Sequence, residues 1–111
     1  MKRIPRFMRY LLFALVFCST VALAAGDAAK GSDLFLKKCK TCHGADGAGT
    51  PAMLKKFAGK MKPLGGPEVQ AMKDPALAKE IAEAANHKAI AKTLKPADID
   101  DLVAHIRTLK K

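Results

Sequence analysis

Apolar side chains recur at helical spacing in the last part of the chain. Five of them fall at offsets of 0, 3, 4, 7 and 10 residues, along one stripe of a helix. Acidic residues lie in the first turn of this stretch and basic residues lie in its last turn, an arrangement that complements the helix dipole. The pattern predicts a C-terminal helix that starts at Pro96 and buries one face. The residues of the stripe are Ile99, Leu102, Val103, Ile106 and Leu109.

The middle of the chain divides into helical stretches and loops rich in glycine and proline. A helix is predicted over residues 28–40, with Asp27 as its N-cap. Residues 44–51, GADGAGTP, end that helix. A short helix over residues 52–59 and a second loop over residues 62–67, KPLGGP, follow. Because the alternation typical of β-strands is missing from the sequence, we predict an all-α fold.

A further helix is predicted over residues 76–85. Asp74 is a candidate N-cap, and Pro75 suits the first helical position. Asn86 tolerates the left-handed conformation in which many helices end. His87 is therefore expected in a loop, just past this helix and ahead of the C-terminal one.

Residues 1–24 have the parts of a secretory signal peptide. A basic start is followed by an apolar run, and Ala22-Leu23-Ala24 has the small-x-small pattern of a cleavage site. We predict cleavage after Ala24, which leaves one domain over residues 25–111. The apolar run of 16 residues is shorter than a membrane span, which needs roughly 20. An uncleaved membrane anchor is the alternative.

The predicted mature chain is small and basic. Residues 25–111 hold 16 Lys and Arg against 10 Asp and Glu, a net charge of +6. Few aromatic residues and no groove-reading motif argue against nucleic-acid binding, so an acidic protein partner is favoured. A chain of this size buries only about 60–65% of its unfolded surface. A cofactor with its own apolar surface would complete such a core.

Residues Cys39 to His43, CKTCH, form the C-x-x-C-H motif that attaches a c-type haem. Cys39 and Cys42 are spaced to form thioethers with the two vinyl groups of one porphyrin, and His43 can then reach the iron as the proximal ligand. The predicted cofactor is one covalent haem c with its iron. A thioredoxin-like redox pair would need a βαβ unit, and a zinc site would need four ligands. Neither pattern is present in the sequence, and a chance match is the remaining alternative.

With its surroundings, this motif resembles the small class I cytochromes c of the bacterial periplasm. The resemblance covers residues 31–109 and rests on Gly31, Phe35, CKTCHGADGAGTP and the ending HIRTL. It implies a small cytochrome c fold, in which three or four helices wrap around one covalent haem and the terminal helices cross at Gly31 and Phe35. His105 replaces the family's usual aromatic residue, and we expect it to be an interhelix contact. The family orients the proximal imidazole through a proline carbonyl, for which Pro51 is the candidate; a plain turn residue is the alternative.

Two kinds of residue compete for the sixth position on the iron. The resembled family supplies a methionine seven residues before a leucine, and counting back from Leu94 leads to His87. His87 is therefore the favoured distal ligand. Met72 and Met61 are alternatives, Met53 is a further candidate, and an open site is also considered. For the methionines, the alternative role is gap filling in the core.

The function predicted from these residues is one-electron transfer by a monomeric carrier that is not an enzyme. The protein would work in the periplasm without stable membrane insertion after cleavage. One alternative is an open sixth site that binds a small ligand or gives minor peroxidase activity, although no distal acid–base pair is evident. Another is a fixed haem subunit of a larger redox complex. We expect a set of lysines around the haem edge to steer acidic redox partners: Lys40, Lys55, Lys56, Lys60 and Lys88. For each of them, the alternative is an ordinary solvated surface residue.

Overall fold

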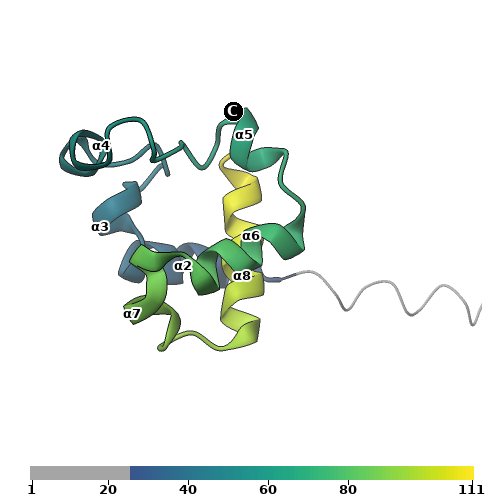
Figure 1. The fold of residues 1–111 in the computed structure, drawn as a ribbon. Helices are drawn as coiled ribbons and strands as arrows, with labels where there is room; N and C mark the ends of the chain where they lie inside the picture. The colour runs from purple at the N-terminus through teal and green to yellow at the C-terminus, as the bar shows by residue number, and fades with distance from the viewer. Residues whose placement is uncertain (1–25) are drawn as a thin grey trace, which may run out of the picture.

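The computed structural model describes residues 26–111 (Figure 1). The predicted signal peptide and its cleavage site lie outside these residues. Within the described part, the secondary structure is helical and contains no strand, so the all-α prediction is confirmed. None of the helices in residues 26–111 has the length and apolar character needed to cross a bilayer.

The helices follow the predicted order, with four differences. Of three short helices that the sequence did not predict, one follows the second loop, one contains His87 and one follows His87; in addition, the predicted first helix is divided at Cys39. A helix of one turn leaves no periodic pattern, which explains why these were missed. In chain order the elements are α2 (Ala28–Lys38), α3 (Lys40–His43), α4 (Pro51–Phe57), α5 (Pro67–Gln70), α6 (Asp74–Glu83), the 3₁₀ helix η1 (Ala85–His87), α7 (Lys88–Ala91) and α8 (Pro96–Thr108).

Helix α2 is capped as predicted and is tied to α8 from its first turn. The Asp27 carboxylate accepts hydrogen bonds from the backbone N–H groups of Ala29 at 2.9 Å and Lys30 at 3.1 Å. The Asp27 N–H in turn donates to the Asp101 carboxylate on α8 at 2.7 Å. The cap therefore fixes where α2 begins and also where it meets α8.

The two longest helices, α2 and α8, cross one another (Figure 1), and their backbones approach closely at Gly31. A Cβ atom at Gly31 would overlap the carbonyl oxygen of Asp101 and lie 3.0 Å from the Cβ atom of His105. One turn further along α2, the buried ring of Phe35 packs against His105, with 4.9 Å between the ring centroids. His105 thus makes the interhelix contact expected of it. Burial lowers the pKa of His105, which favours its neutral form.

The apolar stripe predicted in α8 faces the core. Leu102, Val103 and Ile106 are buried. Val103 and Ile106 form a cluster with Leu77 of α6, so α6 packs against the same helix that α2 crosses. Helix α8 is therefore the common support for both α2 and α6.

The close approach at Gly31 predicts a large cost for one added methyl group. Gly31→Ala should lower the free energy of unfolding of the haem-loaded protein by about 2–3 kcal/mol, because the new Cβ atom overlaps the α8 backbone. Denaturant unfolding measures this change. Ser32→Ala, at the next position of the same helix, is the control and should change stability by less than about 0.5 kcal/mol. Equal effects of the two substitutions would contradict the tight crossing.

Candidate cofactor site

A cavity of about 700 Å³ lies in the middle of the helices. Of the five buried apolar side chains in the described residues, four line its wall. These four are Phe35, Leu77, Leu102 and Ile106. The core is thus built around a hollow with an apolar wall. This arrangement matches the expectation that a cofactor completes the core of so small a chain.

Helix α3 presents the C-x-x-C-H motif to this cavity. The His43 N–H donates to the Cys39 carbonyl at 2.9 Å, so the motif forms a single helical turn. Gly44, with φ of 75°, ends that turn directly after His43. Both cysteines are free thiols and line the cavity together with His43. Burial, and then the neighbouring Cys42, raise the pKa of the Cys39 thiol.

The loop after the motif is fastened to α3 by backbone hydrogen bonds. Thr50 donates to the Cys42 carbonyl at 3.0 Å, and Gly49 donates to the His43 carbonyl at 2.6 Å. Pro51 is exposed and is the first residue of α4. The Nδ1 atom of His43 is buried and has no hydrogen-bond partner among residues 26–111. The predicted hydrogen bond from His43 to the Pro51 carbonyl is therefore not formed in this structure. As the first residue of α4, Pro51 has its carbonyl in place for the helix's own hydrogen bonding.

His87 lies across the cavity from His43. The centroids of the two imidazole rings are 6.0 Å apart, and the ring planes differ by 52°. His87 is the last residue of η1, not part of an open loop as the sequence suggested. The Nδ1 atom of His87 lies 2.8 Å from the carbonyl oxygen of Glu80. Because a carbonyl can only accept, Nδ1 carries the hydrogen, and Nε2 keeps the lone pair that a metal needs.

The two imidazoles are spaced to hold one metal ion between them. First-row metals bind imidazole nitrogen at about 2 Å, and two such bonds plus the half-widths of two rings give a centroid separation of about 6 Å. Burial, and then the nearby His87, lower the pKa of His43. Its neutral form, which is the form that binds a metal, is therefore favoured. The apolar wall, the two thiols and the facing imidazoles together fit a covalently attached haem.

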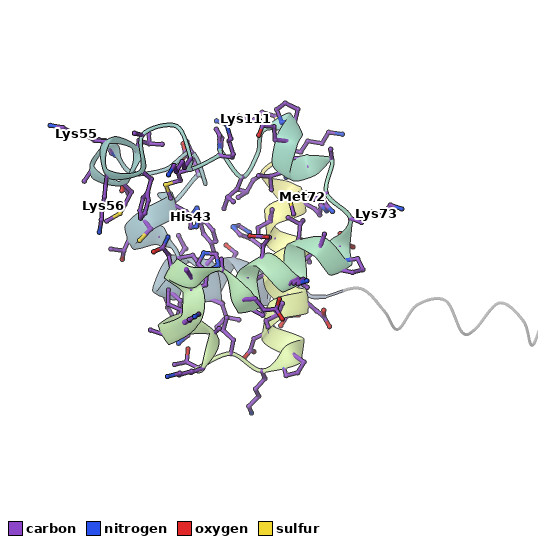
Figure 2. The ribbon with its side chains drawn as sticks, in the orientation of Figure 1. His43, Lys55, Lys56, Met72, Lys73 and Lys111 are labelled. Atoms are coloured by element: carbon purple, nitrogen blue, oxygen red, sulfur yellow. The ribbon has the colours of Figure 1, made fainter. Side chains whose placement is uncertain are left out.

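Three methionines line the same cavity, which keeps all the sequence candidates near the site. They are Met53, Met61 and Met72. Met72 also packs against the Leu77, Val103 and Ile106 cluster, and Figure 2 shows it beside α8. Within residues 26–111, no group of three or more His, Cys, Asp or Glu side chains gathers in a metal-binding arrangement. The four ligands that a zinc site would need are therefore not assembled in this part of the chain.

Comparison with known proteins agrees with this site. A family model for cytochrome c matches residues 28–110. The chain belongs to the cytochrome c family. A solved structure, the KustC0563 c-type cytochrome, is similar at 31% identity and a TM-score of 0.61 over 73% of this chain and 98% of that chain. No match was found among curated proteins. This cytochrome is thus a haem-based electron-transfer protein with a covalently bound c-type haem and its iron.

Proposed function

We propose that this cytochrome carries single electrons between larger redox proteins in the bacterial periplasm, with His43 and His87 as the two axial iron ligands. The observation that supports this most strongly is the pair of imidazoles 6.0 Å apart across the cavity. Cys39 and Cys42 attach the porphyrin through thioethers. The bound haem supplies a one-electron Fe(III)/Fe(II) couple, and the protein holds its ligands and its surroundings.

A filled sixth position favours a carrier over an enzyme or a ligand-binding protein. The hydrogen bond from His87 to the Glu80 carbonyl orients the imidazole ring and fixes its tautomer through protein contacts alone. A peroxidase or gas-binding protein needs that position open. With both ligands held by the fold, electron transfer needs little rearrangement of the protein.

Lysines around the cavity favour an acidic partner. Among the charged residues that line the cavity, Lys38, Lys56, Lys60 and Lys62 outnumber the single acid, Glu80. Lys40, Lys55 and Lys88, expected at the haem edge, are also exposed. Such a surface attracts a negatively charged protein over the distance set by ionic screening.

Replacing the proposed distal ligand by methionine should raise the reduction potential. A thioether stabilises Fe(II) relative to Fe(III), whereas a second imidazole favours Fe(III). His87→Met is therefore expected to raise the potential by on the order of 100 mV. Spectroelectrochemical titration of the haem-loaded protein measures this change.

Two matched variants show whether a methionine already occupies the sixth position. Met72→Leu and Met61→Leu should leave the low-spin optical spectrum unchanged and move the potential by far less than His87→Met does. If either leucine variant became high-spin, that methionine would be the ligand and the proposed role of His87 would be wrong.

The lysine surface predicts opposite salt effects for oxidants of opposite charge. The rate of oxidation by a small anionic oxidant should fall about tenfold as salt rises from low to high ionic strength, and the rate with a cationic oxidant should rise. Stopped-flow mixing with the reduced protein measures both rates. Lys56→Glu and Lys60→Glu should each weaken this dependence.

Lys73→Glu is the matched control, because it changes the net charge equally at a different place. Figure 2 shows Lys73 on the opposite side of the molecule from Lys55 and Lys56. If Lys73→Glu changed the rates as much as the cavity variants, net charge alone would explain the salt effect, and the docking surface would be abandoned.

A further inference from the structure

Arg107 makes an unusual set of contacts for a residue in the last turn of a helix. Its Nε and Nη2 atoms donate to one carboxylate oxygen of Asp74 at 3.0 and 2.7 Å. Its Nη1 donates to the Gln70 carbonyl at 2.9 Å, and Nη2 also donates to the Met72 carbonyl. One guanidinium on α8 thus holds three points of the turn between α5 and α6, residues 70–74.

Gln70 fastens the same turn from its other end. Its side-chain amide donates to the Leu64 carbonyl at 2.8 Å and to the Ile106 carbonyl of α8 at 2.9 Å. We call Arg107, Gln70 and Asp74 the α8 clamp. The side chain of Asp74 is 69% exposed, so its ion pair with Arg107 alone contributes little to stability. The carbonyls at the end of α5 matter more, because a helix end leaves such groups without partners inside the helix.

The clamp holds the backbone of the methionine that lies in the turn. Met72 lines the cavity, yet it also packs against Leu77, Val103 and Ile106 next to α8. A thioether is a good ligand for haem iron, and methionine is flexible enough to reach in several ways. A movement of the turn that carries Met72 away from α8 and toward the iron would break its bonds to Arg107.

We propose that Arg107 is a positioning residue that keeps Met72 packed on α8, so that the sixth iron position is left to His87. The inference rests on the proposed His87 ligation and adds to it the reason why a methionine of the same cavity does not take the iron. The planar guanidinium suits this task because its donors point in fixed, different directions. A lysine at position 107 would keep the charge but could not reach the three acceptors in this way.

The test uses haem-loaded protein in which the sixth position has been vacated. In His87→Ala, the clamp should hold Met72 away, so the haem is high-spin and binds carbon monoxide. In His87→Ala/Arg107→Gln, Met72 is released and should ligate the iron. The haem should then become low-spin with a methionine-to-iron charge-transfer band, and the affinity for carbon monoxide should fall at least tenfold. Adding Met72→Leu to that double variant should restore the high-spin state.

Matched variants separate positioning from loss of stability. His87→Ala/Asp74→Asn removes the ion pair but keeps the carbonyl contacts, and it should stay high-spin. His87→Ala/Arg107→Lys is a milder change that serves if the glutamine variant does not fold. It should show a smaller fraction of the methionine-ligated form than the glutamine variant.

The outcomes distinguish failure of the clamp from failure of the proposed ligation. If wild type is bis-imidazole and His87→Ala is already ligated by Met72, or if neither Arg107 double variant becomes low-spin, the clamp is overturned alone. If Met72→Leu does not reverse the change, another methionine is responsible and the clamp is again overturned. If wild type shows the methionine band and His87→Ala does not alter it, the proposed ligation and the clamp both fail.

Discussion

The close crossing of α2 and α8 at Gly31 is the constraint on which the site depends. It brings Phe35 against His105, with ring centroids 4.9 Å apart, and the ring of Phe35 then lies 6.4 Å from that of His43. The crossing therefore fixes the end of α2 from which the C-x-x-C-H turn continues. Without the close backbone approach, Phe35 would not lie beside His43, and the cavity wall next to His43 would lose this aromatic side chain.

The distal side of the cavity is supported by the same helix through different contacts. Leu77 anchors α6 to Val103 and Ile106 of α8, and the Glu80 carbonyl of α6 then accepts the hydrogen bond that orients His87. The positions of both imidazoles thus depend on α8: that of His43 through α2, and that of His87 through α6. This shared support is what allows a chain with so few buried side chains to hold two rings 6.0 Å apart.

Much of this arrangement could be predicted from the sequence, because its signals are local or periodic. The stripe of α8, the Asp27 cap and the C-x-x-C-H spacing each follow from a rule about neighbouring residues. The resemblance to the cytochromes c led to His87 through its distance from Leu94, and the structure places its ring 6.0 Å from that of His43. The Asp74 N-cap was misplaced by one residue, since the structure puts the cap at Lys73, and such ends are set by small differences in backbone angles.

The rest depends on tertiary contacts that leave no sequence pattern. The partner of His87 is a backbone carbonyl, which any residue at position 80 would supply. Arg107 reads as an ordinary basic residue at a helix end, although its guanidinium spans the turn over residues 70–74. The path of the GADGAGTP loop is likewise set by backbone bonds that leave no sequence pattern, such as the bond from the Thr50 N–H to the Cys42 carbonyl.

The central claim is that two imidazoles hold the iron, and the spectrum of the oxidised wild-type protein tests it most directly. Low-temperature electron paramagnetic resonance combined with near-infrared magnetic circular dichroism identifies both axial ligands in one sample. The account predicts a low-spin haem with the charge-transfer energy of bis-imidazole ligation and no methionine-to-iron band. A methionine band, or a high-spin signal from an open sixth position, would contradict it.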